Sequence, residues 1–266
     1  MSPGMAAIAT GQKKGLWILL IRKNNLNFQK LFDIMCERYS LGKTKKEIEE
    51  RFQAEMLEPF EPRYNLAPSQ LAPLISSDGP NGFSYFYWGT TPQFAKNKPV
   101  SQKLINARAE TIRENASYKN AFRERRCLIP ADGFYEWKIL GKKIKTPYRF
   151  TLLGEELFAF AGLWDEYENE WGERHHTFLI LTTAANRKVG EVCERMPIIL
   201  TRENERKWLD KRAGPEDLMP LLTPYPEEQM ISYTVSPLVN EVDKDSASLI
   251  RRTSPMDQFG NYTLFG

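Results

Sequence analysis

Cys36, Asn106 and Glu136 are three residues of this sequence whose types and settings could do chemistry. Cys36 directly follows Met35, and an initiator Met before a residue as small as Cys would be trimmed, so a chain begun at Met35 would carry Cys36 at its N-terminus. An N-terminal Cys has a free amine beside its thiol, which an internal Cys lacks. However, 34 residues precede Met35, and most lone cysteines are small buried hydrophobes. We predict that the working protein begins at Cys36, because Met35 is the true start or because the preceding segment is removed.

Glu136 lies in "DGFYEWK", within a predicted strand and among aromatic residues. If its side chain points inward, burial would raise the pKa of the carboxyl, which suits a general acid or base. Because strands alternate faces, an outward-facing and solvated Glu136 is the alternative, and the sequence by itself favours it.

Asn106 and Arg108 lie in "INARAET", where alternate positions of a strand end could point both side chains into one cleft. Arg binds phosphate through paired hydrogen bonds, and Arg38 and Arg195 are further candidates. The alternative is an Asn that caps a helix and arginines that are solvated. Trp88 could stack on a nucleic-acid base, although most aromatic residues pack in the core. His175 and His176 lie beside a predicted turn, which is more typical of a surface than of a metal pair.

The composition excludes several classes of protein. The chain has 266 residues, 41% of them hydrophobic and 27% charged, which is ordinary for a globular protein of one large or two small domains. The net charge of +3 is small, so a nucleic-acid surface would be a local patch. Three cysteines, at 36, 127 and 193, are too few for a disulfide framework and do not fit a zinc site. The apolar run "LWILLI" is too short to cross a bilayer. The sequence implies no metal and no cofactor.

Several segments have clear secondary-structure signals. Thr44 and Glu47 form a capping box ahead of a helix predicted over 45–56. "LAPLIS" and "FSYFYW" predict a β-hairpin, whereas "RYNLAPSQ" (63–70) and 90–103 read as loops. Residues 106–125 predict two short helices, the second capped by Ser117. The centre is rich in aromatic and β-branched residues, which predicts strands in "CLIPADGFYEWKIL", "TPYRFTLL", "LFAFAGLWDEY" and "HTFLILTTAA".

The C-terminal third continues with a helix turn in "NRKVGEVC", a short strand in "RMPIIL", a helix over "ENERKWLD" capped by Thr201, and a last strand in "MISYTVSPLV". We expect one α+β domain in which helices surround a curved, barrel-like mixed β-sheet. The predicted divisions are a dispensable leader or mis-assigned start (1–34), the catalytic domain (35–245) and an irregular C-terminal tail (246–266).

Ordered blocks along the chain resemble the SOS-response-associated peptidase family of abasic-site shielding proteins. The resemblance covers about Met35 to Asn240 and rests on "MCERYSLGKTKKEIEERF", "YNLAPSQ", "WGTTP", "INARAET", "RRCLIPADGFYEWK", "FAFAGLWDEY", "TFLILTTAAN", "RMPIIL" and "VSPLVN". It implies a single α+β domain that senses abasic sites in single-stranded DNA and bonds covalently to the ring-opened sugar. The implied partner is that DNA, with no membrane; we further expect a monomer that is cytoplasmic and nucleoid-associated when on DNA.

The resemblance also implies residue roles. Cys36 would be the catalytic Cys, whose amine and thiol together close a thiazolidine on the sugar aldehyde, and Asn106 and Glu136 would complete the active site. Arg38, Arg108 and Arg195 would bind phosphates, and Asn65, Trp88, Thr182 and Pro197 fall in blocks that line the cleft. With Glu136, Cys36 could also remove a leader, which is the peptidase activity, and a Schiff base permits weak strand cleavage by β-elimination.

Two positions depart from the family pattern. Glu37 replaces the usual Gly after the Cys and puts a carboxylate beside the expected DNA groove. Cys193 takes the place of the usual active-site His, and its reference pKa of about 8.5, against about 6.5, makes it a poorer proton carrier near neutrality. The alternatives to a crosslinking sensor are a peptidase that processes other proteins, a non-covalent single-stranded nucleic-acid binding module and an unrelated domain.

Overall fold

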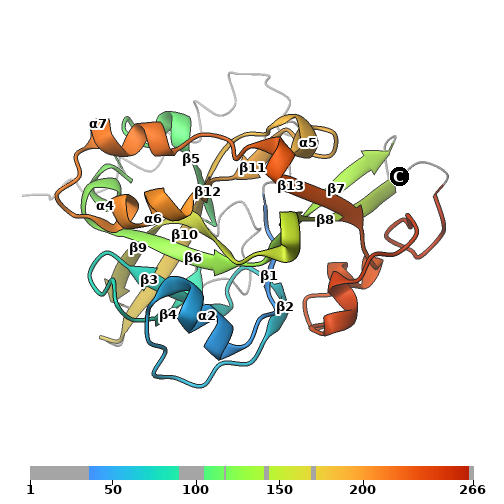
Figure 1. Ribbon diagram of the computed structural model, residues 1–266, viewed down its shortest axis with the longest axis horizontal. Helices are drawn as coiled ribbons and strands as arrows, with labels where there is room; N and C mark the ends of the chain where they lie inside the picture. The colour runs from blue at the N-terminus through green and yellow to red at the C-terminus, as the bar shows by residue number, and fades with distance from the viewer. Residues whose placement is uncertain (1–35, 90–104, 117, 141–143, 169–171, 264–266) are drawn as a thin grey trace, which may run out of the picture. The chain divides into compact units, whose positions relative to one another are not determined.

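The computed structural model describes residues 36–89, 105–116, 118–140, 144–168 and 172–263 (Figure 1). By its internal contacts the chain divides into Met1–Asp33 and Ile34–Gly266, and the description below concerns the second unit. The predicted leader (1–34), the predicted loop at 90–103 and the predicted cap Ser117 lie outside the described residues. Among the described residues, no helix has both the length and the apolar character needed to cross a membrane.

Five strands close into a mixed β-barrel. They are β3 (Leu71–Ser76), β4 (Ser84–Trp88), β6 (Arg126–Ala131), β9 (Phe158–Glu168) and β10 (Arg174–Ala184). The order β10–β4–β3–β6–β9 closes because β9 also pairs with β10, and the β10–β4 pairing is parallel. The short strands β5 (Asn106–Arg108), β11 (Arg195–Pro197) and β12 (Ile199–Leu200) extend this sheet. Closure removes unpaired sheet edges and leaves an interior filled with side chains.

A second sheet contains β1 (Tyr39–Leu41), β2 (Arg63–Leu66), β7 (Gly133–Leu140), β8 (Ile144–Leu152) and β13 (Met230–Thr234), in the order β13–β8–β7–β1–β2. Every pairing in this sheet is antiparallel. Residues alternate faces along β7: Phe134 packs with Phe150 and Phe160 in the main core, whereas Tyr135 and Trp137 pack in a smaller cluster on the other face. This alternation decides where Glu136 points.

Short helices surround the sheets, as Figure 1 shows. They are α2 (Lys45–Phe52), α4 (Lys119–Glu124), α5 (Arg187–Gly190), α6 (Arg202–Leu209) and α7 (Pro215–Leu218), with 3₁₀ turns at Ala109–Thr111, Leu153–Glu155, Met219–Leu221, Glu227–Gln229, Pro237–Asn240 (η7) and Ala247–Ile250 (η8). The predicted α+β class with a barrel-like sheet is confirmed. The capping box of Thr44 and Glu47 is also confirmed, but the helix ends at Phe52 because Gln53 adopts a left-handed conformation.

Long-range pairing corrects two secondary-structure predictions. The segment predicted as a loop contains β2, because Arg63–Leu66 pairs with β1. The segment predicted to start a helix at Asn106 begins with β5, which pairs with β10 in parallel register. The Thr201 prediction holds for position only, since Thr201 is the N-cap residue of α6 but its side chain makes no capping bond. Local signals could not reveal these partners, which lie far away in sequence.

The predicted irregular tail is fixed to the domain. It carries the turn η8, whose Leu249 is buried, and the backbone N–H of Thr253 donates to the carbonyl of Thr234 at the end of β13 (2.9 Å). The Thr234 hydroxyl donates in turn to the Thr253 carbonyl (2.7 Å). The tail therefore covers the β13 edge of the second sheet.

Candidate active site

Asn106 holds the backbone of Cys36. The Asn106 Nδ2 amide donates a hydrogen bond to the Cys36 carbonyl at 2.8 Å, and both residues are buried. Asn106 begins β5, opposite Ile180 of β10, so the barrel wall fixes its position. The Oδ1 atom of Asn106 is buried and has no hydrogen-bond partner among the described residues. A buried acceptor without a donor costs free energy, so this atom is available to a ligand that supplies a donor.

Glu136 is fully buried on the inner face of β7, the same face as Phe134. The inward interpretation of the sequence is therefore correct, and the outward alternative is wrong. Neither carboxyl oxygen has an N–H or O–H partner among the described residues. Burial raises the pKa of Glu136 well above its usual value, and a hydrogen bond from the Cys193 thiol lowers it in part. A buried carboxyl whose pKa is raised holds its proton to higher pH than a solvated one, which suits a proton donor.

The Cys36 thiol lies in the same buried environment. Its Sγ contacts the Arg38 carbonyl at 3.7 Å. Burial raises the pKa of this thiol well above its usual value, and negative charge on Glu136 raises it further. Cys193 also contributes to this rise, so the two thiols and the Glu136 carboxyl influence one another electrostatically. The structure thus brings together the four residues predicted as catalytic: Cys36, Asn106, Glu136 and Cys193.

Cys193 reaches this cluster from the segment that follows α5, where its backbone N–H donates to the Val189 carbonyl at 2.9 Å. The N-cap of α5 is Asn186, whose side chain accepts from the Val189 N–H at 2.9 Å. The helix turn predicted in "NRKVGEVC" is therefore present, and it delivers the thiol to Glu136.

Arg108 and Arg195 flank the end of β10. In register, Thr182 lies opposite Arg108 on one side and Pro197 on the other. The Arg195 guanidinium forms two hydrogen bonds with the Glu110 carboxylate, at 2.7 and 3.0 Å, and contacts the carbonyl and hydroxyl of Thr182 at 2.8 and 3.0 Å. Arg108 is exposed. Sequence reasoning missed Glu110, although it lies at the next alternate position after Arg108 in "NARAE".

Arg38 lies two residues after Cys36. Its Nη1 donates to the Glu37 carbonyl at 2.8 Å, and its Nε is buried without a partner among the described residues. Burial lowers the pKa of this guanidinium. An anion bound beside it would offset that effect, because opposite charge favours the charged form.

Three residues predicted to contact DNA are buried in the protein. Trp88 is 1% exposed, its indole N–H donates to the Ile105 carbonyl (2.9 Å), and its ring packs between Tyr39 and Phe178, so it cannot stack on a base in this arrangement. Asn65 is fully buried, with its Nδ2 within hydrogen-bond distance of three backbone carbonyls. Thr182 is also fully buried, and its hydroxyl accepts a hydrogen bond from Arg195. Aromatic and amide side chains can either pack inside a protein or contact nucleic acid, and the sequence alone does not distinguish the two.

His175 and His176 both lie on β10. His176 stacks on Phe86 and contacts Glu166 at 2.8 Å. Within the described ranges no group of three or more His, Cys, Asp or Glu residues is arranged to hold a metal ion. We assign these histidines no part in the site.

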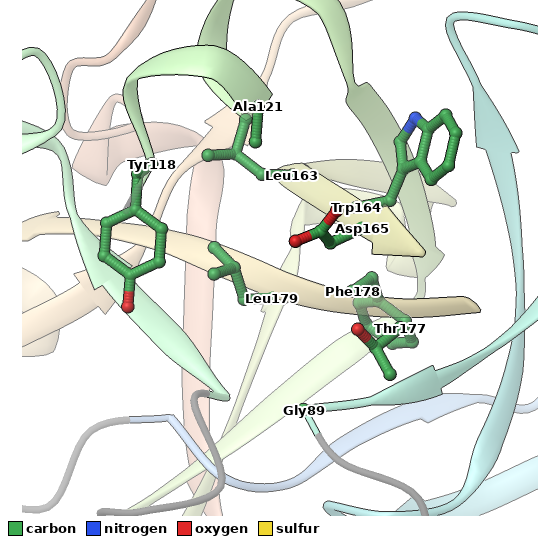
Figure 2. Close-up of a pocket in the computed structure, with 9 residues that line it drawn as sticks. All are labelled: Gly89, Tyr118, Ala121, Leu163, Trp164, Asp165, Thr177, Phe178 and Leu179. Carbon is green, nitrogen blue, oxygen red and sulfur yellow. The ribbon is translucent and has the colours of Figure 1, made fainter. Parts of the chain in front are cut away.

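An apolar pocket of about 240 Å³ lies on the barrel wall (Figure 2). Leu163, Trp164 and Asp165 of β9 and Thr177, Phe178 and Leu179 of β10 line it, with Tyr118 beside α4. None of the predicted site residues belongs to its lining. Its position does not connect it to the Cys36 cluster, so it is not part of the candidate active site.

The barrel, the second sheet and the Cys–Asn–Glu cluster define a known class of α+β protein. The model of the family described as "SOS response associated peptidase (SRAP)" matches residues 35–242. The chain therefore belongs to the SRAP family, and the resemblance noted in the sequence is confirmed.

Relatives and solved structures agree with this assignment. The chain is 42% identical over 221 residues to the abasic site processing protein YoqW of Bacillus subtilis, covering 81% of this chain and 99% of the relative. It is 27% identical over 228 residues to the abasic site processing protein YedK of Escherichia coli, covering 82% and 99%. A crystal structure of a protein from Bacteroides thetaiotaomicron has a TM-score of 0.73 at 26% identity, covering 82% of this chain and all of that one.

Proposed function

We propose that this chain processes abasic sites in single-stranded DNA by forming a covalent crosslink through Cys36 as its N-terminal residue. The observation that carries the proposal is the cluster in which Asn106 holds the Cys36 backbone and Glu136 is fully buried with a raised pKa. The names of the relatives supply the substrate class, since each is called an abasic site processing protein. A ring-opened abasic sugar carries an aldehyde, which an aminothiol can attack with both of its nucleophiles.

The amine attacks first in this proposal. Burial raises the pKa of the Cys36 thiol, so little thiolate exists near neutral pH, whereas an α-amine with a reference pKa of about 7.7 to 8.0 is partly neutral. Attack on the aldehyde gives a carbinolamine. Glu136 then donates its proton to the departing hydroxyl, which leaves as water and yields the Schiff base. The free Oδ1 of Asn106 accepts a hydrogen bond from a hydroxyl of the open sugar.

The thiol closes the ring in the second step. After it has donated its proton, Glu136 is a carboxylate and accepts the proton of the Cys36 thiol as sulfur adds to the Schiff-base carbon. The product is a five-membered thiazolidine, and Glu136 returns to its protonated form. Cys193 donates a hydrogen bond to Glu136 and stabilises its charged form between the two steps. The same Schiff base permits weak strand cleavage by β-elimination.

Charged side chains around the cluster position the strand. Arg108 is exposed at the end of β5, and Arg195 can exchange the Glu110 carboxylate for a phosphate because both ligands take paired hydrogen bonds. Such contacts fix the position of a nucleic acid without reading its sequence, and they weaken as salt rises.

The proposal requires a free amine on Cys36. In a chain that keeps the residues before Cys36, this nitrogen is an amide and cannot form a Schiff base. Either translation from Met35 or removal of the preceding segment would supply the amine. Self-cleavage, with Cys36 as nucleophile and Glu136 as proton donor, would account for the word peptidase in the family description.

A denaturing gel with single-stranded DNA that contains one abasic site tests the proposal. We would compare the full chain, a chain begun at Met35 and the Met35-start chain with Cys36→Ala, and add Cys127→Ala as a matched control, because Cys127 is buried elsewhere in the core. We expect a heat-stable adduct from the Met35-start chain and its Cys127→Ala variant, and none from Cys36→Ala. Intact mass would reveal whether the full chain shortens itself to Cys36. Absence of an adduct from every chain would refute the proposal and favour reversible binding.

A further inference from the structure

A small pocket lies beside Cys36 on the opposite face of β7 from Glu136. It measures about 150 Å³ and is lined by Glu37, Arg38, Trp137, Lys145 and Asn240. Tyr39 faces the main core, so strand alternation turns Arg38 to the other face. In register, Trp137 lies opposite Pro147 and Ile139 opposite Lys145, which puts Trp137 and Lys145 on that same face.

The polar groups of this pocket are mainly donors. Lys145 is exposed, and its backbone is held by a hydrogen bond from its N–H to the Gln258 side chain at 2.7 Å. The indole N–H of Trp137 donates to Asn240 Oδ1 at 2.8 Å, so the Asn240 Nδ2 amide points away from Trp137. That amide and the Arg38 Nε are both buried without a partner among the described residues. Burying such donors costs free energy unless an acceptor reaches them.

We propose that Lys145 and Asn240 join Arg38 to bind a backbone phosphate of the DNA next to the lesion, and that Glu37 weakens this binding. The inference rests on the proposed function in taking single-stranded DNA as the ligand. Phosphate oxygens accept several hydrogen bonds at once, and two cations with an amide donor nearby suit them. Because two residues span at most about 7 Å of backbone and the Arg side chain adds a similar reach, a phosphate bound at Arg38 lies within a few nucleotides of the Cys36 amine.

Glu37, which stands where the family pattern usually has Gly, gives a second test of the proposal. Among the described residues that line the pocket, it carries the one acidic group, and its carboxylate repels an anion there. Removing that charge without changing the size of the side chain should strengthen DNA binding. A solvated Glu37 that faces away from the strand would have no such effect.

The experiment is a fluorescence-anisotropy titration of an undamaged single-stranded oligonucleotide at several salt concentrations. Both the full chain and the Met35-start chain would be titrated, each as wild type, Lys145→Gln, Asn240→Asp, Glu37→Gln and the control Lys46→Gln. Lys46 lies on α2, and its side chain is 84% exposed. Asn240→Asp keeps the oxygen that accepts from Trp137 but replaces the donor by a charge, and thermal unfolding would check that each variant is folded.

We expect Lys145→Gln to weaken binding about threefold to tenfold and to reduce the slope of log K against log salt by about 0.7. Asn240→Asp should weaken binding at least as much, Glu37→Gln should tighten it, and Lys46→Gln should change neither quantity. The proposed phosphate site would be refuted if Lys145→Gln and Lys46→Gln changed the affinity and the salt slope equally. It would also be refuted if neither wild-type chain bound the oligonucleotide. The adduct gel separates the two proposals. If an adduct forms but DNA binding does not depend on Lys145, the phosphate site alone is refuted. If binding depends on Lys145 but no adduct forms, the phosphate site is supported and crosslinking is refuted.

Discussion

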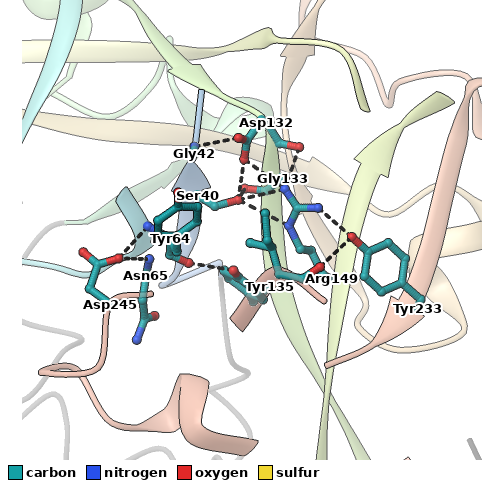
Figure 3. A network of polar contacts seen from close by, with 11 residues as sticks. Ser40, Gly42, Tyr64, Asn65, Asp132, Gly133, Tyr135, Arg149, Tyr233 and Asp245 are labelled. Carbon is teal, nitrogen blue, oxygen red and sulfur yellow. Dashed lines mark hydrogen bonds and ion pairs between the residues drawn. The ribbon is translucent and has the colours of Figure 1, made fainter. Parts of the chain in front are cut away.

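Strand β7 borders two buried polar clusters that differ in one respect. At its start, Asp132 and Arg149 form a buried ion pair at 2.9 Å, to which Ser40 and Tyr233 add hydrogen bonds of 2.6 and 2.7 Å (Figure 3). Gly133 leaves room for this pair, since a Cβ there would lie 2.6 Å from the Arg149 Nε. Three residues further on, Glu136 has no N–H or O–H partner within the described part of the chain.

The difference separates stability from function. The Asp132–Arg149 cluster ties β1, β7, β8 and β13 together, and every charged group in it is paired. Fully satisfied buried networks of this kind fix a fold. In the Cys36–Asn106–Glu136 cluster, among the described residues, the Asn106 Oδ1 has no partner and Glu136 is bonded by a thiol rather than by an N–H or O–H group. Such groups cost free energy, and in a native structure they call for an explanation such as a ligand or a reaction.

The largest expected effect is on the crosslinking rate of Glu136→Gln. Gln keeps the size of the side chain but cannot donate and recover a carboxyl proton, so single-turnover crosslinking should slow about 10²- to 10⁴-fold. The free energy of unfolding should stay the same or rise, because a buried ionisable group is removed. Adduct formation followed over time on a denaturing gel measures the first quantity and urea unfolding the second. A variant that crosslinks at the wild-type rate would remove Glu136 from the mechanism.

Asp132→Asn is the matching change in the paired cluster, and it should lower stability without slowing crosslinking. The Arg149 charge would stay buried without its counter-charge, which lowers the free energy of unfolding by about 3–5 kcal/mol. Crosslinking per folded molecule should be unchanged at a temperature where the variant is still native. Urea unfolding monitored by tryptophan fluorescence gives the stability. A loss of crosslinking in fully folded Asp132→Asn protein would erase the distinction between the two clusters.

Asn106→Ala should have an intermediate effect. It removes the 2.8 Å hydrogen bond to the Cys36 carbonyl and the free Oδ1, so we expect crosslinking to slow about tenfold, the equivalent of roughly 1.4 kcal/mol. Asn120→Ala, at an exposed position of α4, is the matched control and should leave the rate unchanged. Equal rates for the two variants would mean that Asn106 only supports the fold.

Local sequence signals predicted the groups that could react but not all of their surroundings. The aromatic alternation of "GFYEWK" predicted a strand through Glu136, and only the pairing of β7 with β1 and β8 decided that it faces inward. The family blocks identified Asn106 and Cys193, whereas their approach to Cys36 depends on β5 and on the end of α5. Trp88 and Asn65 are buried by contacts from distant segments, which no local pattern encodes.

The smallest expected effect is a pH dependence that distinguishes the two clusters without any substrate. The pKa of Glu136 is raised in the folded state, so the native protein holds a proton there that the unfolded chain releases above about pH 4.3. Its contribution to stability is complete below that pH and is lost as the pH rises toward the folded pKa, by at most about 1.4 kcal/mol per pH unit. Glu136→Gln removes the loss, so its stability advantage over wild type should grow between pH 5 and pH 8. Urea unfolding at several pH values measures this difference in the free energy of unfolding. A difference that does not change with pH would mean that Glu136 has the same pKa in the folded and unfolded chains. It would then not hold the proton that the mechanism requires.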